Sequence, residues 1–234
     1  MKVLSVIRAE SVRAERIVGG DYGYLPEAAA MLTKQYGFIG IPTAEELVSP
    51  DQSKGIVFRS GKLETDHRLI PIDEFHLFSN GLSVTTHSNT TDSDLVLDHI
   101  MEWAKSAFKL EVEPLKPGTG HSSQLEIRLH KPLPELFPYL SEIGAAITKG
   151  LDDWWEFKPS YELININFWH DKTKYPQFAP PAFRLDRRDN VSFEQEAYYS
   201  EAPMSTENHI AVLEKLERVC LEALEKMKVK NTGA

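Results

Sequence analysis

The chain has 234 residues, of which 41% are hydrophobic and 26% are charged, and its formal net charge is −9. This length and apolar content are enough for one large domain or two small ones, each with a buried core, and they exclude a disordered chain. The negative charge disfavours broad attraction to nucleic acid or to an anionic membrane, because phosphate binding needs a concentrated positive field.

The single cysteine, Cys220, excludes an intrachain disulfide and favours a reducing compartment, so we expect a cytoplasmic protein. It shares a helical stripe with Leu213 and Leu216, which predicts a packing role rather than a nucleophilic one. The apolar segment near the N-terminus is too short for a signal sequence, and no apolar run reaches the roughly eighteen residues of a membrane span. We therefore expect neither export nor membrane insertion.

The N-terminal quarter shows alternating strand and helix signals. Residues 3–7 predict a strand, and the charged segment that follows is compatible with a helix ending at Gly19. Pro26 predicts the first turn of a helix that Gly37 ends, because proline fits a helix start and glycine its left-handed exit. Thr43-x-x-Glu46 is a capping box for a short helix.

Further along, a polar turn separates two strand-like runs and is followed by an amphipathic helix. Residues 75–78 and 82–86 flank Asn80-Gly81, a pair typical of a type I′ hairpin turn. Thr91 is the expected cap of the helix that follows.

The same plan recurs near the C-terminus. Residues 183–185 and 193–199 flank Asp189-Asn190, and Ser205 opens the last long helix. Because the second unit needs an insertion and the two share few side chains, convergence and internal duplication are equally good explanations.

Residues 114–123 are rich in proline, glycine and serine, which predicts a connecting loop between an N-terminal half, 1–113, and a C-terminal half, 124–234, of one compact domain. The predicted fold class is α+β: mainly antiparallel sheet with helices packed on one face, built partly from two pseudo-repeated hairpin and helix units.

Three groups of polar residues are weak candidates for a catalytic or metal-binding site. His170 and Asp171 directly follow a strand-like run, which makes them catalytic candidates. Glu156 and Lys158 form the Glu-x-Lys pair used by metal-dependent nucleases. The candidate metal ligands are His87, Asp92 and Asp94, although acidic residues at this place also favour the positive end of a helix dipole.

A proline-rich segment with aromatic residues, 170–183, together with Trp154 and Trp155, is the predicted binding surface; the alternative is that these rings close the end of the sheet and are buried. Tyrosine, tryptophan and phenylalanine supply large contact areas, and proline limits the entropy that a loop loses on docking. The predicted binding residues, including two arginines from the densest basic cluster, are Trp154, Trp155, Tyr175, Phe178, Arg187 and Arg188.

These features favour a protein that acts by binding rather than by catalysis. The leading hypothesis is a subunit of a complex, or an acidic inhibitor or immunity-type protein that binds a basic protein partner, with no cofactor. A metal-dependent hydrolase or nuclease is one alternative. A small-ligand sensor is the other.

Overall fold

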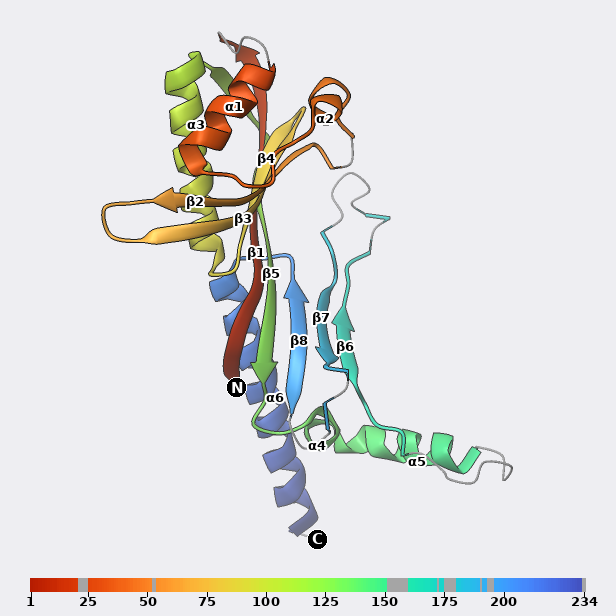
Figure 1. Cartoon of the computed structure of the whole chain (residues 1–234). Helices are drawn as coiled ribbons and strands as arrows, with labels where there is room; N and C mark the ends of the chain where they lie inside the picture. Colours follow the sequence, from red (N-terminus) through yellow and green to blue (C-terminus); the bar gives the residue numbers. More distant parts are fainter. Residues whose placement is uncertain are drawn as a thin grey trace. The chain divides into compact units, whose positions relative to one another are not determined.

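The fold is an antiparallel α+β arrangement, and its computed structural model describes residues 1–20, 25–51, 54–150, 160–171, 173–174, 180–189, 191–192 and 196–232 (Figure 1). The first half of the chain supplies β1 (Lys2–Gly19), α1 (Leu25–Tyr36), α2 (Ala44–Val48), β2 (Ile56–Glu64), β3 (Leu69–Phe78), β4 (Gly81–Thr86) and α3 (Thr90–Phe108). The second half supplies β5 (Glu111–Arg128), α4 (Leu133–Leu136), the 3₁₀ helix η1 (Pro138–Leu140), α5 (Ser141–Gly150), β6 (Asn165–Phe168), β7 (Phe183–Arg187), β8 (Ala197–Ala202) and α6 (Thr206–Thr232).

The two halves repeat one plan. Each runs from a long strand through short helices to three further strands and a final long helix. The strand order in the sheet is β2-β3-β4-β1-β5-β8-β7-β6. β1, β2, β3 and β4 of the first half correspond to β5, β6, β7 and β8 of the second, and each half has the same order counted from its own end of the sheet. The pseudo-repeat predicted from the two hairpin and helix segments is therefore confirmed, and it extends to all eight named strands.

The chain forms two compact units. Unit 1 comprises Met1–Ser5, Leu125–Ala202 and Glu207–Ala234, and unit 2 comprises Val6–Gln124 and Pro203–Thr206. The segment predicted to be a connecting loop, 114–123, lies instead within β5, so that prediction is wrong. In the sheet, β5 lies beside β1, which comes from the start of the chain. The proline and glycine content of residues 114–123 does not reveal a partner that is so distant in sequence.

The same reason accounts for a second correction. The charged segment up to Gly19 is not helical but continues β1, which pairs with β4 from Ala9↔Thr86 to Ala14↔Gly81. Other local signals in this region are confirmed. α1 ends before Gly37, whose φ is +62°, and Thr43 and Glu46 form both bonds of the capping box.

The hairpin between β3 and β4 differs in detail from the predicted one. Phe78 pairs with Gly81, so Ser79 and Asn80 form the turn, and neither has the positive φ of a type I′ turn. Gly81 is instead required by close packing, since a Cβ there would lie 2.5 Å from the backbone oxygen of Arg13 on β1. The cap of α3 also shifts, because the Asn89 side chain, not that of Thr91, accepts from the Asp92 amide at 2.8 Å.

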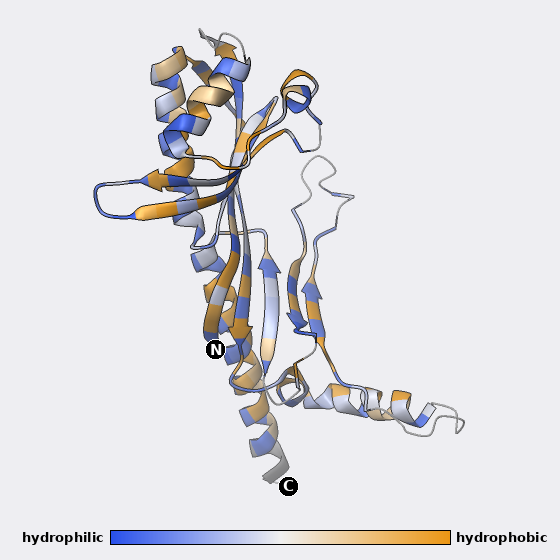
Figure 2. Cartoon of the chain, viewed as in Figure 1, coloured by the Kyte–Doolittle hydropathy of each residue, from blue (hydrophilic) through white to orange (hydrophobic). Residues whose placement is uncertain are grey.

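An aromatic cluster forms the centre of the unit 2 core. Phe58 has ring centroids 5.4 Å from Phe38 and 5.8 Å from Phe75, and all three side chains are buried. Tyr36 of α1 contacts Trp103 of α3 edge to face at 5.9 Å, so the two helices pack together as well as against the strands. Figure 2 shows hydrophobic stretches in β2 and β3 interrupted by hydrophilic ones.

Candidate functional site

Unit 1 exposes a group of large apolar side chains between residues 139 and 169. We call them the aromatic surface, although three of its seven residues are isoleucines. Each is at least 43% exposed: Tyr139, Ile143, Ile147, Tyr161, Ile164, Phe168 and Trp169. Single exposed apolar residues are ordinary, whereas seven between residues 139 and 169 make this part of unit 1 the candidate interaction site.

Close backbone packing brings α5 against the segment that leads into β6. A Cβ on Gly144 would lie 2.1 Å from the backbone oxygen of Tyr161, so only glycine permits this approach. A groove of about 620 Å³ lies beside this contact, lined by residues of α4, η1, α5 and the segment 160–163. Apolar side chains such as Phe137 and Leu163 line it together with the polar Thr148 and Glu162.

β6 is the last strand in the sheet order and pairs with β7, from Asn165↔Asp186 to Phe168↔Phe183. Its ladder extends over four residues. Phe168 is 57% exposed, yet its ring meets the buried Phe183 edge to face at 5.9 Å. This contact fixes the direction of an exposed aromatic side chain at the sheet edge.

The predicted binding residues are only partly covered by the described part of the chain. Trp154, Trp155, Tyr175 and Phe178 lie outside the described residues. Both arginines make contacts within unit 1: the Arg187 guanidinium donates to the Val191 carbonyl, and that of Arg188 donates to Glu126. These bonds hold the end of β7, so the two arginines also have a structural role.

Of the predicted catalytic residues, Glu156 and Lys158 also lie outside the described residues, whereas His170 and Asp171 are described. The Asp171 carboxylate accepts from the Thr173 hydroxyl at 2.6 Å and from its amide at 3.0 Å, and these bonds lower the pKa of Asp171. His170 Nε2 is buried without a hydrogen-bond partner among the described residues.

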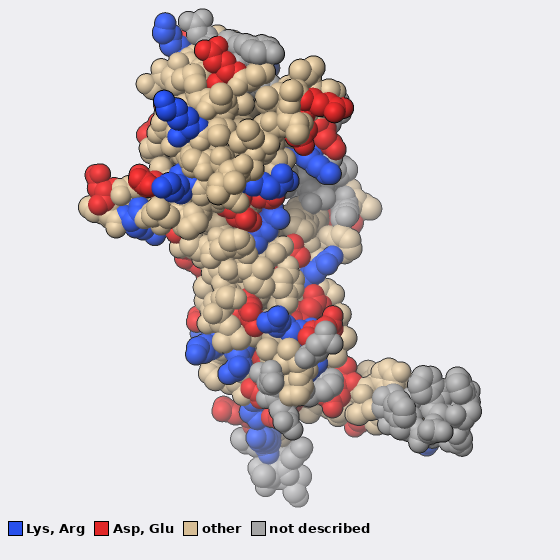
Figure 3. All heavy atoms as spheres, in the orientation of Figure 1, with Lys and Arg blue, Asp and Glu red and all other residues tan. Residues whose placement is uncertain are grey.

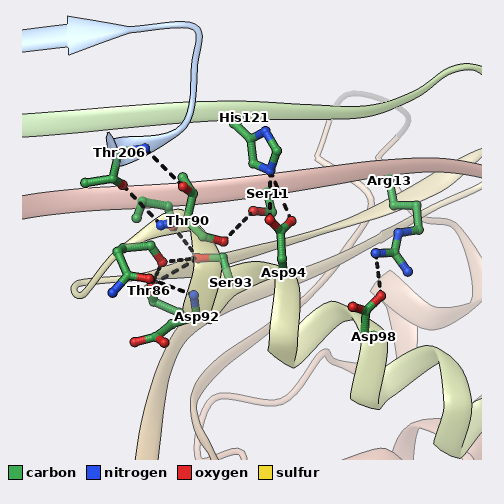
Figure 4. A network of polar contacts seen from close by, with 12 residues as sticks. Ser11, Arg13, Thr86, Thr90, Asp92, Ser93, Asp94, Asp98, His121 and Thr206 are labelled. Atoms are coloured by element: carbon green, nitrogen blue, oxygen red, sulfur yellow. Dashed lines mark hydrogen bonds and ion pairs between the residues drawn. The ribbon is translucent and has the colours of Figure 1, made fainter. Parts of the chain in front are cut away.

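The three candidate metal ligands lie near the start of α3, but each has a different partner. His87 Nδ1 lies 2.6 Å from the Ile7 carbonyl. Asp92 pairs with Arg68. Asp94 lies 3.0 Å from Nε2 of His121 (Figure 4). Among the residues that the structure describes, no group of three or more histidine, cysteine, aspartate or glutamate side chains is placed to hold a metal ion.

A buried network of hydroxyl groups surrounds this helix start (Figure 4). Ser11 donates to the Thr90 carbonyl at 3.2 Å, Ser93 donates to the Ala9 carbonyl at 2.9 Å, and the Thr86 and Ser93 hydroxyls are 3.0 Å apart. These bonds join β1, β4 and α3 within unit 2. The network satisfies buried backbone and side-chain groups, which is a structural role.

Unit 1 holds a serine and histidine pair that the sequence did not single out. Ser200 of β8 and His209 of α6 are fully buried, and Ser200 Oγ lies 2.8 Å from His209 Nε2. The same hydroxyl donates to the Arg184 carbonyl at 2.7 Å, so its lone pairs face a protonated Nε2. With its proton directed to Arg184 and its histidine nitrogen already protonated, Ser200 is not arranged as an activated nucleophile.

Acidic and basic side chains are interspersed on the face of the molecule seen in Figure 3, which shows no extended basic field over its described residues. Cys220 is buried, and this burial raises the pKa of its thiol, in agreement with a packing role. None of the helices in the described part of the chain is long and apolar enough to cross a membrane. The chain matches no protein-family model, and no curated protein is significantly similar to it.

Proposed function

We propose that the protein is a protein-interaction module, either a subunit of a complex or an acidic inhibitor, and that it binds a basic partner through the aromatic surface of unit 1. The observation that carries the proposal is the exposure of Phe168 and Trp169, 57% and 64%, at the end of the terminal strand β6. Aromatic side chains of this kind are the commonest anchors of protein interfaces.

The mode of binding that fits this surface is the addition of an extended partner segment to β6. A terminal strand offers backbone donors and acceptors to another chain, and these groups give affinity, while alternate side chains give specificity. The chain's net charge of −9 favours a partner with a positive field, which speeds association at low salt. A single buried cysteine is compatible with a cytoplasmic location.

The test compares proteins captured from the native host by the wild-type chain with those captured by the double variant Phe168→Ala and Trp169→Ala. We expect one or more basic proteins to be lost from the double variant, because two exposed aromatic anchors are removed from the surface. Val48→Ala is the matched control: Val48 is an exposed apolar residue of α2, 78% exposed, in unit 2.

Direct binding is then measured by calorimetry with the purified candidate partner at low and high salt. The proposal predicts at least a tenfold loss of affinity for the double variant, about 1.4 kcal/mol, none for Val48→Ala, and weaker binding at high salt. Equal binding by all three proteins, or self-association of the chain through this surface in place of a partner, would contradict it.

The two alternatives, a metal-dependent hydrolase or nuclease and a small-ligand sensor, remain predictions from the sequence. The hydrolase or nuclease would use residues that include Glu156 and Lys158. Metal-induced stabilisation against heating, measured with magnesium, manganese and zinc, tests it.

A further inference from the structure

Unit 2 contains a cavity of about 200 Å³ between helices α1 and α3 and the strands β1 to β4. Apart from Glu15, Ser79 and Gly81, its lining consists of apolar and aromatic side chains. An engineered apolar cavity of roughly 150 Å³ in another protein is large enough to bind benzene. The unit 2 cavity therefore has room for a ring or a short branched alkyl group.

The lining combines exposed and buried side chains: Ile17 is 46% exposed, whereas Phe58 and Phe75 are buried.

Glu15 is the charged residue of this lining. Its Oε2 atom is buried and has no hydrogen-bond partner among the described residues. The backbone holds the residue in place, since the Glu15 amide donates to the Asn80 carbonyl at 3.2 Å. A buried carboxylate oxygen without a donor is costly, and an ionised carboxylate only accepts hydrogen bonds.

We propose that this cavity binds a small amphiphilic amine, whose apolar body fills the space between α1 and α3 and whose ammonium group donates to Glu15 Oε2. A purely apolar ligand would leave Oε2 unpaired, and an anionic ligand would be repelled. The ammonium charge is also attracted by the opposite charge of the carboxylate, and this attraction is stronger in an apolar cavity than in water, which favours an amine over an alcohol. This site is independent of the partner surface in unit 1.

The test is calorimetry on the full-length chain with phenethylamine and with propylbenzene, its neutral counterpart of similar shape. We expect wild type to bind the amine at least tenfold more tightly than the hydrocarbon. Glu15→Gln is expected to lose at least tenfold in affinity for the amine while its affinity for propylbenzene changes less than twofold. An unchanged amine affinity in Glu15→Gln, or no binding of either compound to wild type, would overturn the proposal.

A second pair of variants shows whether the ligand occupies this space. Ala104→Leu adds a larger side chain to the lining, whereas Ala107→Leu makes the same change at an exposed position of α3 outside it. Both compounds should lose binding to Ala104→Leu and retain it with Ala107→Leu, with circular dichroism confirming the fold of each. Amine binding that survives in Ala104→Leu would place the ligand elsewhere and defeat the proposal.

Discussion

His209 is a buried histidine whose ionisation is coupled to folding. Its side chain is fully buried between Ser200 and the ring of Phe183, which it meets edge to face at 5.7 Å. Burial lowers the pKa of His209 from 6.5 to about 4, because the charged imidazolium is poorly solvated there. The folded protein therefore holds this side chain neutral under conditions in which the unfolded chain binds a proton.

This difference predicts acid-sensitive stability. The unfolded state takes up the proton near pH 6.5 and the folded state only near pH 4, so the contribution of His209 is complete above pH 6.5 and falls as the pH decreases to about 4. The loss is about 3 kcal/mol, from 1.36 kcal/mol per pKa unit. Urea unfolding of wild type and of His209→Gln at several pH values measures it. A wild-type minus variant difference that stays constant from pH 7 to pH 4 would show that His209 is not responsible.

Single residues also show why site prediction from the sequence stopped short. Asp92 and Asp94 were reasonable metal candidates because both begin a helix, but their partners, Arg68 and His121, are 24 and 27 positions away. Sequence spacing gives no sign of those pairings. Ser200 and His209 are only nine positions apart. A serine on a strand followed by a histidine on the next helix is a common sequence pattern, however, and it does not by itself predict that the two side chains are in contact.

At the scale of elements, the starts of the two long helices are bonded to each other. The Thr90 amide donates to the Thr206 hydroxyl at 3.1 Å, and the Thr206 amide donates to the Thr90 hydroxyl at 3.0 Å. These residues are the first of α3 and of α6, so they are equivalent in the two repeats. Two amides at helix starts, which have no partner within their helices, are thus satisfied by one reciprocal contact.

Removing one of these hydroxyls should weaken the fold measurably. We expect Thr90→Val to lower the free energy of unfolding by about 1–2 kcal/mol, because it leaves the buried Thr206 amide without its acceptor while preserving shape. Thr90→Ser keeps the hydroxyl and should lose clearly less. Chemical denaturation compares the two variants with wild type, and a loss for valine no larger than that for serine would show that the hydrogen bond contributes little to stability.

Elements that depend on residues close to them in sequence were predicted well. Elements that depend on pairing with distant strands were not. The capping box at Thr43, the glycine stop at Gly37 and both hairpin and helix segments follow from residues close in sequence. β1 and β5 each extend over 18 residues, through charged or proline-rich sequence. Their extension depends on strands that come from elsewhere in the chain, so neither propensity nor periodicity reveals it.

At the scale of the whole molecule, the repeat places one strand of each half at an end of the sheet order: β2 in the first half and β6 in the second. The two strands differ. β2 extends over nine residues and buries Ile56, Phe58 and Leu63, whereas β6 extends over four and leaves Phe168 exposed. The proposed function therefore lies in a difference between equivalent elements, which the sequence-level repeat alone does not predict.

The difference between β6 and β2 also supplies the most direct test of the proposed interaction. Amide hydrogen exchange is measured on the chain alone and in complex with the partner identified by capture. We predict slower exchange in the complex for residues 141–150 and 161–169, with no change across β2, the equivalent strand of the other half. Slower exchange confined to β2 or to other parts of unit 2, or unchanged exchange in α5 and β6, would contradict binding through the aromatic surface.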